Sequence, residues 1–254
     1  MSRFGSKLRA RALPGFAAVL WALPAAAQEA PLRCDARLLP AGAVLGATAA
    51  VALVPVVFAA HLPHATCAPC DPAGLPGIDR GTVGAVRTGP ATASDVALLA
   101  TGGGAGLLLL RGARGDLAMA REDLTVLAQA VGTAMLVSDW AKVLFHRPRP
   151  YRYDAASAGS AGTPDAGLSF PSGHTAAAFS AALAYWSIEA RRGVAGRHTP
   201  EIAALVAGAA VTGALRVAAR KHFPTDVLAG AALGAGVGWA VPRLYPVRRP
   251  AGAP

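Results

Sequence analysis

Three short stretches of the sequence carry side chains that could bind and cleave a phosphate ester. They are KVLFHRPRP at 142–150, PSGH at 171–174 and RVAARKHFPTD at 216–226. Their arginines present planar, permanently charged donors that match phosphate oxygens, and their lysines add point charges. Their histidines can serve as a nucleophile and as an acid. The sequence therefore predicts a site for phosphate chemistry.

The first stretch reads as the end of a helix. Its two prolines cannot continue a helix, so the helix predicted over 122–145 should end near His146 and leave Lys142 in its final turn. Arg149 follows just outside, and we expect both cations to bind phosphate. The alternative is a pair of side chains that only reach for a membrane boundary. Asp139 lies three residues before Lys142, and we expect the two to pair.

The second stretch reads as the start of a helix. Ser172 suits the N-cap position, and Gly173 follows it, so the first backbone N–H groups of the helix should be available to phosphate oxygens. His174 falls in the first turn, where it could protonate a departing alkoxide. The alternative is a capped turn that contains a histidine by chance.

The third stretch reads as a connection between two helices. Arg216 ends one helix, His222 lies in the connection, and Pro224 takes a favourable early position in the next. Asp226 then falls in the first turn, from which its carboxylate could reach back to His222, as in a capping box. Such a bond would fix the tautomer of His222 for attack on phosphorus. The alternative is a His–Asp pair that only closes a loop.

Long apolar runs must position these three stretches. Hydrophobic residues make up 54% of the chain and charged residues only 15%. Each of six runs approaches the roughly 20 residues that cross a hydrocarbon core about 30 Å thick. We therefore predict an all-α fold, a polytopic membrane helix bundle with about six transmembrane helices in one domain. The predicted spans are 41–62, 91–110, 122–145, 174–190, 201–219 and 226–243.

Small residues favour close contact between these helices. Gly230, Gly234 and Gly238 lie four residues apart, on one face of the last predicted helix. In lipid, such a stripe lets two backbones approach each other. The alternative is coincidence, since the chain has 29 glycines.

Basic residues orient the predicted bundle. The basic residues of three loops share one side of the membrane, and the positive-inside tendency makes that side cytoplasmic. A second set of basic residues lies at the opposite ends of the helices, together with all three stretches. An anionic substrate would explain the positive charge there. The net charge of +10 is thus split between two faces, and few aromatics accompany it, so we expect no nucleic-acid partner. We predict a multi-pass protein of a bacterial-type inner (plasma) membrane, with its site on the periplasmic or extracytoplasmic side. The loop residues are Arg111, Arg114, Arg121, Arg191, Arg192, Arg197, Arg243, Arg248 and Arg249.

The N-terminal residues resemble an export signal. Basic residues precede an apolar stretch, and Ala25-Ala26-Ala27 offers a cleavage site, so we expect 1–27 to be a signal peptide or an N-terminal anchor. Cleavage would place Gln28 outside, and a single crossing by 41–62 would then put the arginine loops on the wrong side. Either the first segment stays uncleaved and inside, or 41–62 does not cross fully, as Pro55 would allow.

Three cysteines lie near the first predicted span. Cys34 precedes it, and Cys67 and Cys70 form a CxxC after it. On the outer face, a disulfide between two of the three is the plain expectation. The alternatives are a redox motif, which needs a thioredoxin-like context, and a zinc site with His61 or His64.

Together, the pattern K-x6-RP, PSGH and R-x5-H-x3-D resembles the three-part signature of the type 2 phosphatidic acid phosphatase superfamily. That superfamily includes lipid phosphate phosphatases, undecaprenyl-diphosphate phosphatases and vanadium haloperoxidases. One departure is Leu215, where many members have serine, and it concerns one minor hydrogen bond. The resemblance implies that His222 forms a phosphohistidine, that His174 is the general acid and that Asp226 is the partner of His222. It also implies a phosphate cradle made by Lys142, Arg149, Ser172, Gly173 and Arg216.

The resemblance runs from about Asp95 to Leu244. We therefore expect a catalytic core at 91–245. The expected flanks are a membrane segment with a cysteine-containing loop at 28–90 and a C-terminal tail at 246–254.

The acidic residues bear on cofactors. The 14 acids are scattered and form no Asp-x-Asp pair, whereas Mg²⁺-dependent phosphatases need clustered carboxylates. We expect no metal and no cofactor, because the cations can take over the metal's role.

The expected partner is a lipid phosphate or an isoprenyl diphosphate in the membrane. Candidates are phosphatidic acid, phosphatidylglycerol phosphate, undecaprenyl diphosphate and lipid A, and nothing in the sequence indicates an oligomeric state. The alternatives are a vanadate-dependent haloperoxidase, a lipid phosphotransferase and a non-catalytic lipid-binding membrane protein.

Overall fold

Six long helices build the part of the protein that the structure describes, and each overlaps one predicted span. The computed structural model describes residues 32–58, 67–157 and 164–248. The predicted signal or anchor at 1–27, most of the tail and the residues His61 and His64 lie outside these ranges. The long helices of the described part are α1 (Leu38–Val57), α3 (Thr88–Gly112), α4 (Leu117–Phe145), α5 (Gly173–Arg191), α6 (Thr199–Ala218) and α7 (Pro224–Ala240).

Short elements complete the described part of the chain. Strand β1 (Arg33–Cys34) pairs antiparallel with β2 (Val247–Arg248), which joins the two ends of the described chain. A one-turn helix, α2 (Gly77–Arg80), precedes α3. Single 3-10 turns lie at Pro72–Gly74, Pro150–Tyr153, Pro164–Gly167, Ala195–His198 and Val241–Leu244.

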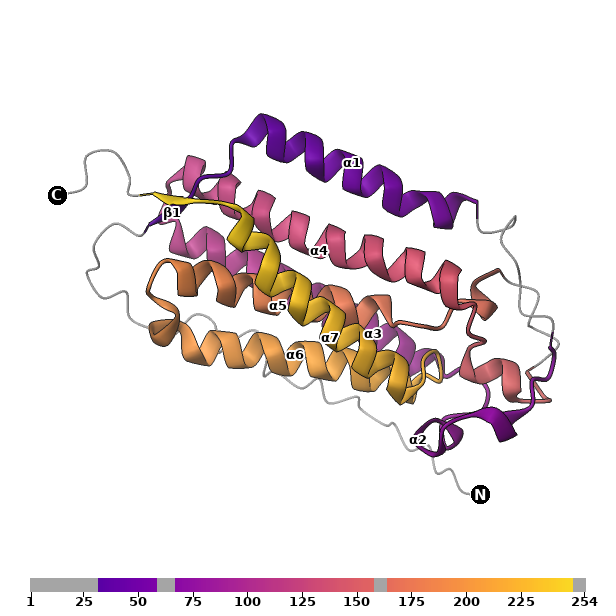
Figure 1. The fold of residues 1–254 in the computed structure, drawn as a ribbon. Coiled ribbons are helices and arrows are strands. Elements are labelled where there is room, and N and C mark those ends of the chain that lie inside the picture. Colours follow the sequence, from indigo (N-terminus) through magenta and orange to yellow (C-terminus); the bar gives the residue numbers. More distant parts are fainter. Residues whose placement is uncertain (1–31, 59–66, 158–163, 249–254) are drawn as a thin grey trace, which may run out of the picture.

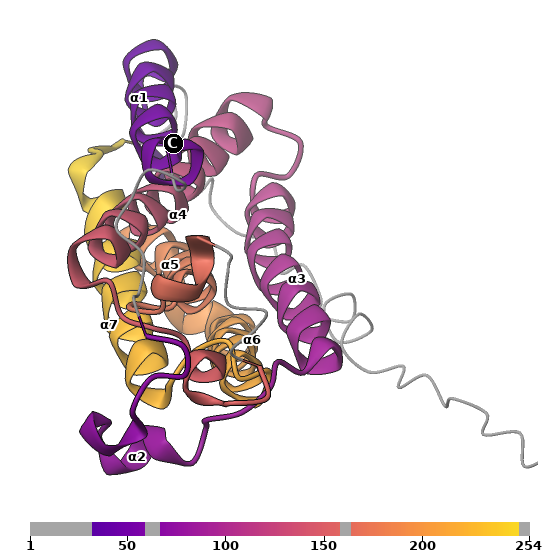
Figure 2. The ribbon, with the colours of Figure 1, turned by 90° about the vertical axis from the view of Figure 1, so that its right-hand side faces the viewer.

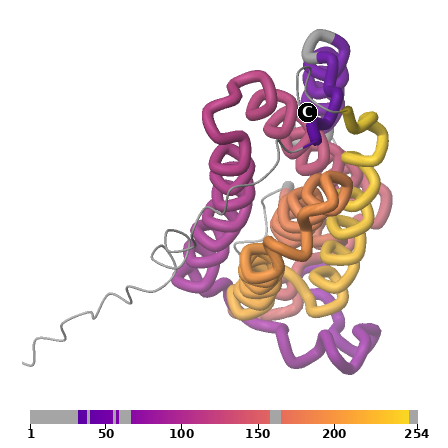
Figure 3. Tube along the Cα trace, turned by 90° about the vertical axis from the view of Figure 1, so that its left-hand side faces the viewer, coloured from indigo at the N-terminus to yellow at the C-terminus, as the bar shows by residue number. Residues whose placement is uncertain are grey.

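Helix α5 is the central element. Figure 2 shows it between α3, α4, α6 and α7, with α1 outside α4. In Figure 3 the tube of α3 (magenta) stands on one side of the orange helices and that of α7 (yellow) on the other. Most residues of α5 are buried, including Ser180, Ser187 and Glu189. Such a helix touches protein rather than lipid, and its polar residues can be satisfied there.

Four helices of the described part are long and apolar enough to cross a membrane, namely α3, α4, α6 and α7. In α1 the apolar stretch is shorter, Pro40–Val54. The interior position of α5 explains its lower hydropathy. The protein is therefore nearly all-α with a membrane-type bundle, in which four of the six predicted spans have the composition of a crossing helix.

The glycine stripe of α7 lies directly against the backbone of α5. A Cβ on Gly230, Gly234 or Gly238 would come within 2.1–2.5 Å of a carbonyl oxygen of α5 or of its N-cap. Real Cβ atoms do not approach so closely, so the small residues permit this contact. The predicted close approach is confirmed, and it brings the starts of α5 and α7 together.

The bundle has two chemically different ends. The end of α4, the start of α5 and the connection from α6 to α7 meet at one end, close to α2 (Figure 1). The sheet and most of the predicted basic loops lie at the other, which we call the basic end. Not every arginine there is a free surface charge, because Arg192 is buried and pairs with Asp123 and Glu189.

Helix α1 runs from the basic end toward the opposite end. Trp140 donates to the carbonyl oxygen of Val51, and Gln129 donates to that of Ala41, so α1 is parallel to α4. Its helical bounds include Pro55, so the chain stays helical through that proline.

Candidate active site

The first stretch ends α4 as predicted. Helix α4 stops at Phe145, and His146 adopts the left-handed conformation with φ 45° at the C-cap. Lys142 lies in the last turn, and its Nζ is 2.6 Å from Oδ1 of Asp139. The predicted pairing of these two side chains is confirmed.

Arg149 is buried in the loop that follows. Its Nε donates to the carbonyl oxygen of Asp165 at 2.8 Å, and its Nη2 pairs with the carboxylate of that residue. Its Nη1 donates to the carbonyl oxygen of Lys221 at 3.0 Å and lies 3.3 Å from Nε2 of His222. Although burial acts to raise it, the charge and hydrogen bond of Arg149 hold the pKa of Asp165 below its ordinary value. These contacts direct the Nη1 edge of the guanidinium toward the imidazole.

His222 has a defined tautomer. Its Nδ1 lies 2.8 Å from the carbonyl oxygen of Ser169, which can only accept, so Nδ1 carries a hydrogen. Burial, with the charges of Arg149, Arg216 and Lys142, places the pKa of His222 well below its ordinary value. The ring is therefore neutral at pH 7, and Nε2 holds a lone pair directed toward Arg149.

The carboxylate of Asp226 does not hydrogen-bond His222 directly, and this corrects the predicted contact. Only the acid half of the predicted capping box is present, because the N-cap residue is Phe223: Oδ2 of Asp226 accepts from the backbone N–H of Phe223 at 2.9 Å and from the hydroxyl of Ser169. Oδ2 lies 3.7 Å from Nδ1 of His222, within ion-pair reach but beyond a hydrogen bond. Nearer donors take up this oxygen, and one of them, Ser169, holds His222 separately through its backbone carbonyl.

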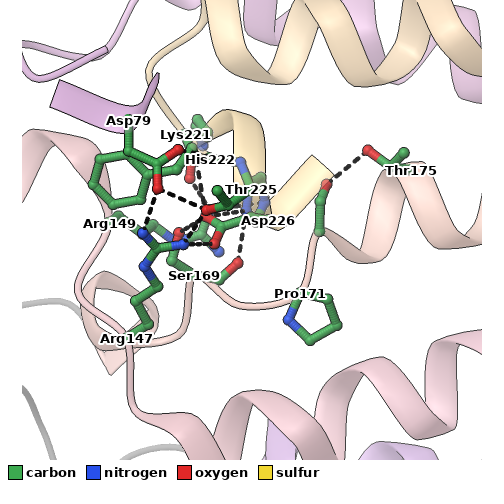
Figure 4. A network of polar contacts seen from close by, with 12 residues as sticks. Asp79, Arg147, Arg149, Ser169, Pro171, Thr175, Lys221, His222, Thr225 and Asp226 are labelled. Carbon is green, nitrogen blue, oxygen red and sulfur yellow. Dashed lines mark hydrogen bonds and ion pairs between the residues drawn. The ribbon is translucent and has the colours of Figure 1, made fainter. Parts of the chain in front are cut away.

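A buried network surrounds Asp226 (Figure 4). Arg147 places one nitrogen on Asp226 and the other on Asp79, which is fully buried. Asp79 also accepts from the backbone N–H and the hydroxyl of Thr225, at 3.2 Å and 2.7 Å. The guanidinium of Arg147 stacks 4.4 Å from the ring centre of Phe223. This network ties α2 to the start of α7, and so to the His222 loop.

The second stretch places Ser172 and Gly173 at the start of α5. Ser172 is the N-cap residue, but its hydroxyl accepts from Thr175 at 2.9 Å instead of capping a backbone N–H. A Cβ on Gly173 would lie 3.2 Å from Nζ of Lys142. The missing side chain thus lets the ammonium group approach the first turn of α5. The N–H of Ser172 donates to the carbonyl oxygen of Asp226 at 3.0 Å, which joins the second and third stretches.

His174 and Arg216 meet the same carboxylate. Oδ1 of Asp95, on α3, lies 2.8 Å from Nε2 of His174 and 3.5 Å from Nη1 of Arg216. Arg216 is buried, and its Nη1 also donates to the hydroxyl of Ser94 at 3.2 Å. Its Nε has no hydrogen-bond partner among the described residues.

Two cations lie close enough to both histidines to act on them electrostatically. The charges of Arg216 and Lys142 act on both His174 and His222. His222 is only 2% exposed, whereas the side chain of His174 is 33% exposed. One histidine therefore lies deep in a cationic site, and the other lies nearer its surface.

A family comparison fits this arrangement. The family model described as PAP2 superfamily matches residues 123–250, about half of the chain. The chain belongs to the PAP2 superfamily. Comparison with curated proteins gave no match, and comparison with solved structures gave none either. Membership implies phosphatase-type activity in a protein with membrane-type apolar helices.

The PAP2 match covers α4 to α7 and leaves out the first three helices. Two residues of the site region come from outside it, Asp79 on α2 and Asp95 on α3. Both residues lie outside the three sequence motifs, and nothing in their local sequence marks them as site residues. Arg147 could have been noticed, since it is the first arginine of RPRP. Among residues of the described ranges, no three His, Cys, Asp or Glu side chains gather as a metal-binding set.

The cysteines lie on different sides of the PAP2 protein. Cys67 and Cys70 form a disulfide, and the carbonyl oxygen of Cys67 and the N–H of Cys70 bond Arg152, just after Arg149. Cys34 is a buried free thiol at the basic end, where burial raises its pKa to about 11. The disulfide loop thus packs on the chain segment that carries Arg149.

Proposed function

We propose that this PAP2 protein is an integral membrane lipid phosphatase that works through a phosphohistidine on His222, without a metal ion. The observation that carries the proposal is the environment of His222. Its Nδ1 hydrogen is held by a backbone carbonyl, and its Nε2 lone pair faces a buried arginine. A neutral imidazole with one unprotonated nitrogen among cations is suited to attack an anionic phosphate.

In the first step, Nε2 of His222 forms a bond to phosphorus, and the bond from phosphorus to the leaving oxygen breaks. Lys142, Arg149 and Arg216 stabilise the charge on the equatorial oxygens. The N–H of Ser172 already donates to the carbonyl oxygen of Asp226, so the donors that this stretch adds to the same cradle are the hydroxyl of Ser172 and the backbone N–H of Gly173. Nε of Arg216 is a buried donor that an oxygen of the phosphate would satisfy.

His174 donates a proton to the leaving oxygen in this step. Its greater exposure supports that role, because the alcohol must depart from the deep site toward its surface. In the second step His174 takes a proton from water, whose oxygen bonds to phosphorus while the N–P bond breaks. Inorganic phosphate is released, and His222 is neutral again.

The orientation in the membrane follows from the two ends of the bundle. The positive-inside tendency makes the basic end cytoplasmic, so the site faces the periplasmic or extracytoplasmic side. Because α1 begins at the basic end, this orientation requires Leu38 to be cytoplasmic. It therefore favours an uncleaved N-terminal segment over a cleaved signal peptide. A lipid phosphate or an isoprenyl diphosphate, anchored at the membrane boundary, is the substrate that such a site would meet.

Phosphate release by the purified protein in detergent tests the proposal. The panel comprises phosphatidic acid, phosphatidylglycerol phosphate, undecaprenyl diphosphate and lipid A, with His222→Ala as the control. We expect release from at least one lipid and none from the variant. A rate that is the same in the variant would contradict the assignment. Transfer of the phosphoryl group from the lipid to an added alcohol, without release of inorganic phosphate, would favour a phosphotransferase.

A further inference from the structure

Asp95 is a charged residue beside the site that the proposed cycle does not use. It lies on α3, outside the PAP2 match, and its side chain is 56% exposed. One of its oxygens contacts both His174 and Arg216. A carboxylate on the side of an anion site that receives phosphate is unfavourable unless it serves another purpose, since it repels the substrate.

The charges around His174 show what that purpose is. Burial of the imidazole and the charges of Arg216 on α6 and Lys142 on α4 oppose its protonation. Asp95 on α3 is the acidic group that contacts the ring. The nearest carboxylate of α7, Asp226, is occupied by Ser169, Phe223 and Arg147. A general acid must hold its proton before the leaving oxygen takes it, so His174 needs a counter-charge among these cations.

We propose that Asp95 is a positioning residue for His174, which holds Nε2–H of the ring by a hydrogen bond and keeps a proton on the imidazole for the leaving group. A carboxylate only accepts, so Nε2 is the donor in this contact. Nδ1 is then the nitrogen that delivers the proton to the leaving oxygen. The contact with Arg216, at 3.5 Å, holds the carboxylate in place. This inference rests on the proposed function, in which His174 is the acid.

The leaving group of the substrate provides the test. An alkyl phosphate expels a strongly basic alkoxide and needs the acid, whereas p-nitrophenyl phosphate expels a weakly basic phenolate and does not. In Asp95→Asn we expect kcat/KM for an alkyl phosphate to fall about 10- to 100-fold. For p-nitrophenyl phosphate we expect a change of less than about threefold, because this parameter covers only the steps up to departure of the leaving group.

Two further variants complete the design. Asp95→Glu retains the charge and should recover most of the activity toward the alkyl phosphate. Asp71→Asn removes an exposed carboxylate that caps the 3-10 turn Pro72–Gly74, and it should change kcat/KM for neither substrate. Thermal unfolding of each variant checks that the fold is retained. Because the side chain of Asp95 is exposed, we expect its replacement to leave the unfolding temperature unchanged.

The outcomes separate the two proposals. Equal losses for both substrates, or no loss for either, would overturn the role of Asp95 while leaving the phosphatase intact. A wild-type protein that releases no phosphate from either ester, or the same amount as His222→Ala, would refute the proposed function and this inference with it.

Discussion

Nδ1 of His222 donates to the carbonyl oxygen of Ser169 across 2.8 Å, although the two residues are 53 positions apart in the chain. The hydroxyl of the same serine donates to Asp226. One residue thus fixes the tautomer of the proposed nucleophile with its backbone and links that nucleophile to a carboxylate with its side chain. The backbone carbonyl and the hydroxyl of Ser169 therefore have different roles, which a substitution of the side chain can separate.

Ser169→Ala should separate stability from chemistry. The backbone carbonyl remains, so His222 keeps its tautomer and we expect kcat within about tenfold of wild type. The buried carboxylate of Asp226 loses one donor, which should cost about 1–3 kcal/mol of stability. Phosphate release and thermal unfolding measure the two effects. Loss of activity comparable to that of His222→Ala would show that the hydroxyl, not the carbonyl, holds the imidazole.

Arg147→Lys should weaken both the fold and the site. The guanidinium bridges Asp79 and Asp226, and a single ammonium group cannot reproduce this two-sided contact. A buried carboxylate would lose its partner, at a cost of about 3–5 kcal/mol if it finds no other. We expect a lower unfolding temperature and a lower kcat.

Asp79→Asn provides the comparison for Arg147→Lys. It keeps the shape of the side chain and removes its charge at the α2 end of the network. We expect the same direction of change but a smaller effect, because Arg147 still pairs with Asp226. Wild-type stability in both variants would mean that the network does not hold the His222 loop.

The acid limb of the pH profile should lie below the ordinary range of histidine. Burial and the charges of Arg149, Arg216 and Lys142 lower the pKa of His222, so the proposed nucleophile stays neutral as the pH falls through about 6.5. The unfolded chain takes up this proton near pH 6.5, whereas the folded protein resists it. The contribution to stability is therefore complete above about pH 6.5 and is lost as the pH falls toward the folded-state pKa.

The pH prediction is checked by kcat/KM on a short-chain substrate, with thermal unfolding at each pH to exclude loss of fold. We expect activity to persist below about pH 6.5. An acid limb centred above that value would contradict the lowered pKa of His222.

Chelation should leave phosphate release unchanged. In the proposed cycle the charge on the transferred group is met by Lys142, Arg149 and Arg216, so no divalent ion is required. The measurement is release from the best lipid before and after treatment with EDTA. Complete loss that Mg²⁺ restores would refute this part of the mechanism.

Much of the local architecture could be predicted from the sequence, because its signals lie close together in the chain. The prolines after Lys142 end α4, Pro224 starts α7, and Asp139 pairs with Lys142 one turn away. The glycine stripe of α7 predicted a close helix contact, which is the one to α5. These features depend on short spacing and on backbone geometry.

The remaining contacts join residues far apart in the chain. Asp79 meets Arg147 from 68 positions away, and Asp95 meets His174 from 79. Neither aspartate has a local pattern that sets it apart from the other acids. The predicted hydrogen bond from His222 to Asp226 was wrong because the prediction rested only on residues of one turn. Ser169, from another loop, contacts both side chains instead.

The span count shows a similar limit. Hydropathy measures how well a segment suits lipid, but α5 is enclosed by other helices and α1 carries a shorter apolar stretch. Six helices were therefore easier to predict than six membrane crossings.

The most direct test of the central claim is to trap the covalent intermediate. The purified protein is mixed with a lipid whose phosphate is radiolabelled, the reaction is quenched rapidly, and the labelled peptide is identified. The same experiment is done with His222→Ala and with His198→Ala, a matched control at the basic end. We predict label on His222 that is stable in base and lost in acid, present in His198→Ala and absent from His222→Ala. Label on another residue, or turnover in His222→Ala at the wild-type rate, would contradict the account.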